Sequence, residues 1–268
     1  NFIYVMIVRI VRIVLIVLNK LFNKNETLQR SFYDGKILRL VTIILRFYSI
    51  FIFPKKQFFK IRTLSTDTVF KLFLSIKNEY KFKYPTYLWR VFGIYEPYTS
   101  LAIKKFCNND DIFLELGAAY GYFTMQISKI CREVHSCEPN GESISYLKKS
   151  IEINNIKNVK AYQCAIGDEN KKITIHGKVT NQINLKNFLS INNISPTFIF
   201  IDCDADDNCL AMGILKMVFE EFKEKKIKII CETREHKLFK SLMEKNSQYT
   251  YKKFSSMHYF VNSHENIN

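Results

Sequence analysis

The sequence lacks any pattern of paired cysteines. Seven cysteines are spread over 268 residues, an odd number, and no C-x-x-C pair occurs. This excludes a disulfide framework and a zinc ribbon. Several cysteines lie in or beside apolar runs, as Cys231 does after Ile230. We therefore expect small buried thiols, no metal site and a reducing, cytoplasmic compartment.

Acidic residues are scarce at the start of the chain. Residues 1–62 contain 12 lysines and arginines but only two acids, so this segment carries +10 of the formal charge of +15. A charge of +15 suggests nucleic acid or an anionic membrane as partner, but the remaining 206 residues carry only +5. We therefore predict a basic extension over 1–62, a lead-in segment over 63–108 and a catalytic domain over 109–268, and we do not favour nucleic acid as a partner.

Long uninterrupted apolar runs are also missing. Two runs of about 17 residues, 2–18 and 37–53, are each broken by two arginines. Each arginine costs about 2.5–3.5 kcal/mol at the centre of a spanning helix. Amphipathic helices fit better, either packed on the body or in peripheral contact with an anionic membrane through residues 1–53. A signal anchor is the third alternative.

Basic and aromatic residues alternate directly after the second run, from Lys55 to Arg62. Such mixing can bind single-stranded nucleic acid. Pro54 and the alternation over residues 57–61 more simply predict a turn and a short strand.

The body of the chain alternates short apolar runs with helical periodicity. Strands are expected over 112–116, 133–137, 159–166, 197–201 and 228–231, and helices over 122–130, 141–154, 210–225 and 235–245. Residues 249–254 and 258–262 are expected to close the chain as antiparallel strands. This alternation predicts an α/β fold with a doubly wound, mostly parallel sheet, whose ligand lies beyond the carboxyl ends of the strands.

Two of only eight glycines, Gly117 and Gly121, follow the first of these strands, and Glu138 follows the second. Glycine allows a cofactor to approach the backbone, and an acid about 20 residues on can accept the hydroxyls of a ribose. A dinucleotide site would need glycine where Ala119 and Tyr122 stand. The spacing E-x-G-x-x-x-G is instead that of S-adenosylmethionine (SAM) sites. The alternative is that the glycines serve tight packing of strand and helix.

Four stretches carry a resemblance to a known family. They are DIFLELGAAYG (111–121), CEPN (137–140), CAIGD (164–168) and FIDCDAD (200–206), and Tyr95-Glu96-Pro97 precedes them. From about residue 95 to residue 262, some 60% of the chain, the sequence resembles the FkbM family of SAM-dependent methyltransferases. The resemblance implies a Rossmann-like methyltransferase fold with SAM as cofactor.

The resemblance also implies roles for individual residues. Glu115 would orient the methionine end of SAM, the backbone of the glycine loop would approach the cofactor, and Glu138 would hold the ribose. Pro139 and Ala165 would flank the adenine. The cofactor-binding set is Glu115, Gly117, Ala118, Ala119, Gly121, Glu138, Pro139 and Ala165.

An acidic cluster follows the fourth strand. Asp202 or Asp204 would be the catalytic base or would hold the substrate. The alternative is a helix cap, for which Asp206, Asp207 and Asn208 suffice. The pattern D-x-D can also recruit a divalent metal. Two further residues are candidates at the substrate edge: Glu232 and His258.

The expected function is therefore SAM-dependent O-methylation of a hydroxyl on a sugar, glycolipid or similar small-molecule acceptor. A nucleic-acid methyltransferase is the first alternative, although the N/D-P-P-Y/F signature of amino-group methylation is absent. A non-catalytic SAM-fold binding protein is the second. Phe200 and Ala205, which replace a lysine and a glycine of the family pattern, leave that alternative open.

Overall fold

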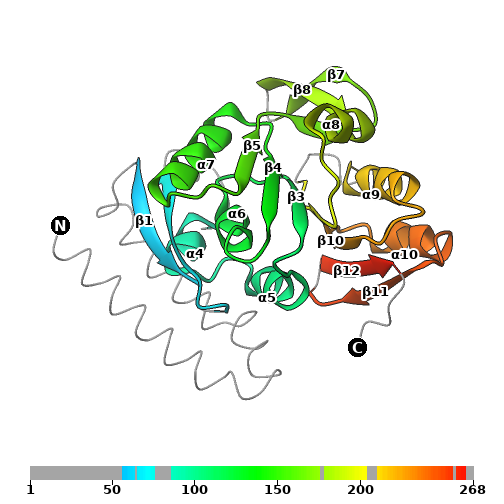
Figure 1. The fold of residues 1–268 in the computed structure, drawn as a ribbon, viewed down its shortest axis with the longest axis horizontal. Helices are drawn as coiled ribbons and strands as arrows, with labels where there is room; N and C mark the ends of the chain where they lie inside the picture. The colour runs from blue at the N-terminus through cyan, green and yellow to red at the C-terminus, as the bar shows by residue number, and fades with distance from the viewer. Residues whose placement is uncertain are drawn as a thin grey trace, which may run out of the picture. The chain divides into compact units, whose positions relative to one another are not determined.

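The computed structural model describes residues 56–63, 65–75, 86–175, 178–203, 210–255 and 258–263 (Figure 1). The chain divides into two compact units, residues 1–100 and 101–268. The expected helices over 2–18 and 37–53 lie outside the described residues, as does the acidic segment 204–209. In the ranges that the structure describes, no helix combines the length and hydropathy that crossing a membrane requires.

The first unit contains a two-stranded antiparallel hairpin, β1 (Lys56–Arg62) and β2 (Val69–Ser75). The strand predicted over 57–61 is therefore confirmed. Alternation along both strands gives the hairpin a buried face and an exposed face, because successive side chains point to opposite sides. The buried face is made of Phe59, Ile61, Phe70, Leu72 and Leu74. Helix α4 (Thr86–Phe92) packs against β1, and α5 (Pro97–Phe106) follows it.

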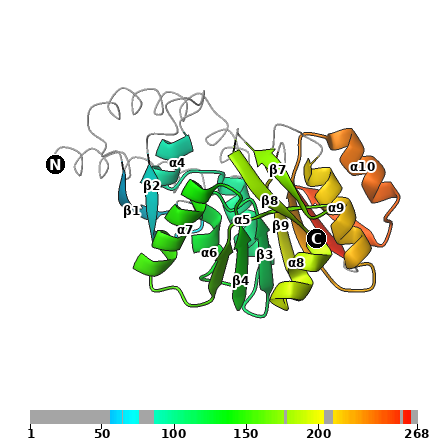
Figure 2. The ribbon, with the colours of Figure 1, turned by 90° about the horizontal axis from the view of Figure 1, so that it is seen from above.

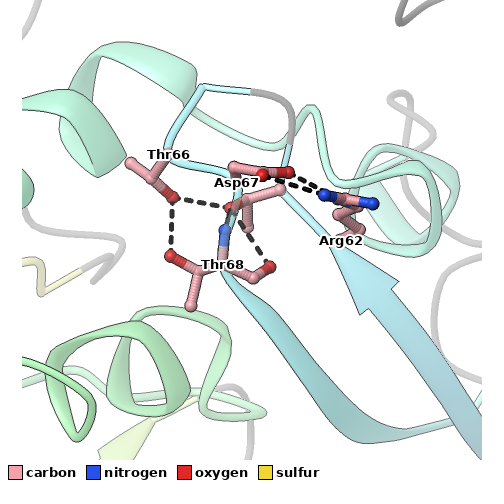
Figure 3. A network of polar contacts seen from close by, with 5 residues as sticks. Arg62, Thr66, Asp67 and Thr68 are labelled. Atoms are coloured by element: carbon pink, nitrogen blue, oxygen red, sulfur yellow. Dashed lines mark hydrogen bonds and ion pairs between the residues drawn. The ribbon is translucent and has the colours of Figure 1, made fainter.

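Polar contacts close the turn between β1 and β2, as Figure 3 shows. The Thr63 hydroxyl lies 2.6 Å from that of Thr66 and accepts the backbone N–H of Thr68 at 2.9 Å. Asp67, at φ 56°, forms a two-contact ion pair with Arg62. The buried hydroxyls are thus satisfied within the turn, as buried polar groups require.

The second unit is built on a seven-stranded sheet in the order β11-β12-β10-β9-β3-β4-β5. The five strands from β10 to β5 are parallel, whereas β12 is antiparallel to both of its neighbours, β10 and β11. Their bounds are β3 Ile112–Leu116, β4 Glu133–Cys137, β5 Val159–Tyr162, β9 Phe198–Ile201, β10 Lys228–Glu232, β11 Tyr249–Lys253 and β12 His258–Ser263. The predicted doubly wound, mostly parallel sheet with antiparallel C-terminal strands is confirmed, whereas the predicted helical N-terminal extension lies outside the described residues.

Helices cover both faces of this sheet. Figure 2 shows α6 and α7 on one side and α8, α9 and α10 on the other. Their bounds are α6 Tyr122–Ile127, α7 Gly141–Ile153, α8 Leu185–Asn192, α9 Leu210–Glu221 and α10 His236–Glu244. Leu114 and Leu116 point into the core beneath α8–α10, whereas Phe113 stacks on Phe198 on the opposite face, with ring centroids 4.8 Å apart. Burial on both faces explains why β3 and β9 are largely apolar.

The strand predicted over 159–166 is divided in the structure. β5 ends at Tyr162, and β6 (Ala165–Gly167) joins a separate three-stranded sheet with β8 (Lys178–Asn184) and β7 (Lys171–Ile175). β7, β8 and α8 have no counterpart among the predicted elements. β7 reads Lys-Lys-Ile-Thr-Ile and is mostly exposed, so it lacks the continuous apolar pattern that identified the central strands.

Asparagine caps α7 where the chain leaves β4. The Asn140 side chain accepts the backbone N–H groups of Glu142 at 2.9 Å and Ser143 at 3.2 Å. These N–H groups have no partner inside the helix, so the cap stabilises its first turn. Asn184 begins α8 in the same way, by accepting the N–H of Asn187.

Replacing the α7 cap tests this account. Asn140→Ala is expected to lower the free energy of unfolding by about 1 kcal/mol because two helix N–H groups lose their acceptor. Asn140→Ser, which restores a capping oxygen, should recover most of that loss. Urea denaturation measures both variants, and equal stability of Asn140→Ala and the wild type would contradict the cap.

Candidate active site

The order of the strands locates the candidate site. From β3 the chain proceeds to β4 and β5 on one side, and then returns to β9 and β10 on the other. In open α/β sheets, ligands bind beyond the carboxyl ends of the strands where the order reverses. In this sheet the reversal lies between β3 and β9, so the candidate site lies beyond Leu116 and Ile201, which are paired.

Strand register brings most of the predicted polar residues to this edge. Leu116 pairs with Cys137 and with Ile201, and Ile201 pairs with Cys231. The residues that follow these strand ends are therefore neighbours along one edge of the sheet: Gly117, Glu138, Asp202 and Glu232. His258, the first residue of antiparallel β12, pairs with Glu232 and joins the same row.

The loop after β3 requires both of its glycines. Gly117 has φ 97°, and a Cβ atom there would lie 1.8 Å from the backbone oxygen of Asp202. Gly121 has φ 85°, and its Cβ would lie 2.4 Å from the Leu147 side chain. Contacts inside the protein thus account for both glycines, in agreement with the packing alternative. They also hold the loop backbone directly against the end of β9.

The carboxylate of Glu138 connects the end of β4 to this loop. One oxygen accepts the backbone N–H of Ala119 at 2.8 Å, and the other accepts that of Asn140 at 2.7 Å. Ala119 has φ 47°, an uncommon conformation for a residue with a Cβ. A carboxylate can accept more than two hydrogen bonds. Glu138 therefore fixes the loop and presents an oriented acceptor at the switch point.

Glu115 lies beneath the loop and is only 1% exposed. Its Oε2 accepts the Thr124 hydroxyl at 2.5 Å and the Ser136 hydroxyl at 2.7 Å. Burial raises the pKa of Glu115 from 4.5 to about 7, although the two hydroxyls partly oppose the rise. Glu115 thus supports the loop from inside the protein. Neither hydroxyl partner was among the predicted site residues, and the available signal was the polar Ser136 two residues before Glu138.

The end of the row at β9 and β10 is acidic. The backbone N–H of Asp202 donates to Leu116 at 2.9 Å, and its carboxyl group lies beside that of Glu232. Glu232 Oε2 lies 3.3 Å from His258 Nε2, and Ser255 contacts the other ring nitrogen at 2.8 Å. Burial opposes ionisation of Glu232, but the hydrogen bond and charge of His258 prevail and lower its pKa to about 2. Asp204 lies outside the described residues.

The remaining predicted residues lie on the β4–β5 side of the loop. Ala118 is buried, and its N–H donates to the Cys137 carbonyl at 3.0 Å. The Pro139 carbonyl accepts the Thr180 hydroxyl of β8 at 3.3 Å. Ala165 is 7% exposed and belongs to β6, which pairs with β8. The small sheet therefore connects the positions proposed to flank the adenine.

No protein-family model matches the sequence, and a comparison with curated proteins finds no match. Solved structures with a similar fold include the methyltransferase FkbM from Methylobacillus flagellatus KT, at 13% identity and a TM-score of 0.45, covering 58% of this chain and 44% of that one. TYW2 of M. jannaschii in complex with AdoMet matches at 14% identity and a TM-score of 0.41, covering 80% of this chain and 87% of that one.

The T. thermophilus 16S rRNA N2 G1207 methyltransferase RsmC, in complex with AdoMet and guanosine, matches at 14% identity and a TM-score of 0.48, covering 78% of this chain and 51% of that one. The chain thus spans about half the length of FkbM and of RsmC. These distant likenesses assign neither a substrate nor a site residue to this chain.

The close approach at Gly117 can be tested against a second glycine. Gly117→Ala places a methyl group against the Asp202 backbone at positive φ, so we expect destabilisation of about 2 kcal/mol or more. Gly213→Ala lies in α9, where an added Cβ meets nothing within 4 Å. It should stabilise the helix by about 0.5–1 kcal/mol. Thermal unfolding compares the two, and similar effects would contradict the proposed clash.

Glu115 should make stability depend on pH. The pKa of Glu115 is raised in the folded protein. Its contribution to the free energy of unfolding is therefore fully present below about pH 4.5 and is lost as pH rises through about 7. One pKa unit corresponds to about 1.4 kcal/mol, so the full loss is about 3 kcal/mol. Glu115→Gln should remove this dependence and be more stable than the wild type at pH 8.

Urea denaturation across this pH range measures the effect. Glu133→Gln is the matched control, because a hydrogen bond from Lys160 lowers the pKa of Glu133 instead. If the free energy of unfolding of Glu115→Gln depends on pH as that of the wild type does, Glu115 does not titrate in this way.

Proposed function

We propose that this chain is a SAM-dependent methyltransferase. The observation that carries the proposal is the Glu138 carboxylate, which is bonded to the Ala119 N–H of the glycine loop at the switch point of the sheet. A carboxylate fixed in this position can accept both hydroxyls of a ribose. The short loop Gly117–Gly121 provides no evident pyrophosphate cradle, which favours a nucleoside cofactor over a dinucleotide.

The residues at this edge suit the cofactor. Glu138 would hold the ribose, the backbone from Gly117 to Gly121 would line the methionine part, and Pro139 and Ala165 would flank the adenine. Glu115 would act indirectly, by fixing the loop through Thr124 and Ser136. When bound, SAM would supply a methyl group on a positively charged sulfur. A nucleophile in line with the carbon–sulfur bond can take the methyl group, and the sulfur leaves with the electron pair of that bond.

Asp202 is the residue we propose to act on the acceptor. Its backbone contacts the glycine loop, and its carboxyl group lies beside Glu232. A carboxylate here can orient an acceptor hydroxyl and take its proton as the new carbon–oxygen bond forms. Asp204 remains a second candidate for the same role.

A hydroxyl on a sugar, glycolipid or similar metabolite is the proposed acceptor. The acidic row Asp202–Glu232 suits a neutral hydroxyl-bearing molecule, and the FkbM-like motifs agree with this class. The basic, apolar segment 1–53 would favour a lipid-linked acceptor at an anionic membrane surface. Six free cysteines among the described residues are consistent with a cytoplasmic location.

Nucleic acid is the second candidate acceptor, and the formal charge of +15 favours it. A phosphate-binding surface predicts an affinity that falls steeply with salt. A SAM-binding protein without catalysis is the third alternative.

Cofactor binding is the first test. Glu138→Ala should weaken SAM binding roughly 10- to 100-fold, because it removes a charged hydrogen-bond acceptor and loosens the loop. Glu152→Ala, an exposed change on α7, should bind like the wild type. Isothermal titration calorimetry with SAM decides, and unchanged affinity in Glu138→Ala would overturn the site assignment.

Methyl transfer is the second test. The protein is incubated with methyl-labelled SAM and cell extract, and label is measured in glycan, lipid, RNA and protein fractions. Asp202→Asn should reduce labelling roughly 100-fold or more while SAM affinity is kept, whereas the exposed Asp110→Asn should label normally. Label in RNA alone would replace the hydroxyl-metabolite proposal, and SAM binding without label anywhere would favour the non-catalytic alternative.

A further inference from the structure

A second polar cluster lies at the opposite edge of the same sheet. Asp111 directly precedes β3 and Cys131 lies shortly before β4, so both are at the amino ends of strands whose carboxyl ends form the candidate active site. Cys107 follows α5. The two thiol sulfurs and a carboxylate oxygen of Asp111 lie within 4.8 Å of one another, and all three residues are buried.

The Asp111 carboxylate is already fixed in place. Its Oδ2 accepts the Lys228 ammonium at 2.6 Å and the backbone N–H of Asn108 at 2.8 Å. Among the described residues, its Oδ1 accepts only the Thr197 hydroxyl, at 2.8 Å. Because each carboxylate oxygen can accept two bonds, Oδ2 is used fully and Oδ1 keeps one acceptor position. Such outer hydrogen bonds are what orient a ligating carboxylate.

The two thiols contact each other, and each is at most 8% exposed. A metal ion that binds thiolates would displace the protons of both thiols.

The charges around the cluster suit a divalent cation. Two thiolates and one carboxylate give three negative charges, and Lys228 supplies one positive charge. A divalent cation supplies two more, which leaves the buried cluster neutral. Neutrality matters because an uncompensated buried charge costs several kcal/mol.

We propose that Cys107, Asp111 and Cys131 bind a zinc ion at the amino edge of the sheet. Thiolate sulfur favours zinc over magnesium or calcium, which prefer oxygen ligands. The three side chains supply three of the four positions of a tetrahedral site, and a water molecule or a backbone carbonyl completes it. The ion links the end of α5 to the starts of β3 and β4. Its role is structural and does not depend on the proposed methyl transfer.

Metal content and a cobalt spectrum test the proposal on the full chain, purified under reducing conditions. We expect about one zinc ion per chain by mass spectrometry after dialysis. Cobalt(II) in place of zinc should give a near-ultraviolet thiolate-to-cobalt band together with the visible bands of a tetrahedral ion. A wild-type protein without bound metal and without this band would overturn the proposal.

Cysteine variants assign the ligands. Cys107→Ser and Cys131→Ser should each bind cobalt at least about 10-fold more weakly and show a weaker thiolate band. Cys203→Ser, at a half-buried cysteine outside the cluster, should retain both. If Cys203→Ser loses the band as fully as Cys107→Ser, the cluster is not the site.

Two further readouts complete the test. Chelation should lower the unfolding temperature of the wild type but not that of Cys107→Ser. If Cys107→Ser does not fold, the wild-type metal content and cobalt spectrum still decide. A mass lower by two hydrogens, with Cys107 and Cys131 joined in one disulfide-linked peptide, would overturn the proposal in favour of a disulfide.

Discussion

The geometry of the candidate site depends on the close approach of two backbones, at Gly117 and Asp202. The N–H of Asp202 donates to Leu116, and the absence of a Cβ at Gly117 lets the loop after β3 rest on the end of β9. These strands are sequence-distant neighbours at the point where the strand order reverses. Any larger residue at Gly117 would separate the glycine loop from Asp202.

Buried carboxylates perform three different tasks in the same domain. Glu115 is held by two hydroxyls and supports the loop, Glu138 is held by two backbone N–H groups and faces the switch point, and Asp111 is paired with Lys228 at the opposite edge. The partners decide the charge state. Burial raises the pKa of Glu115 despite its two hydroxyl partners, whereas the contact with His258 lowers the pKa of Glu232.

Predictions from the sequence were most accurate where the local pattern was strong. β3 and β4 have the expected bounds, because β3 is a mostly apolar run that ends at Gly117, and β4 ends where Pro139 follows Glu138. β7 was missed because its two exposed lysines hide its alternation, and β8 was missed because most of its residues are polar. The predicted strand over 159–166 was wrong as one element, because Gln163 and Cys164 redirect the chain into a second sheet, and this depends on pairing with β8 rather than on local propensity.

Amino-acid order alone was enough to identify the fold class, the glycine loop and the acids at the strand ends, because periodicity and turn residues act over a few neighbouring positions. The contacts that give these residues their tasks came only from the folded chain. Glu115 meets Ser136, Gly117 meets Asp202, and Cys107 meets Cys131 and Asp111. Most of these partners are separated by 21 to 85 residues, and strand register, which no local pattern encodes, brings them together.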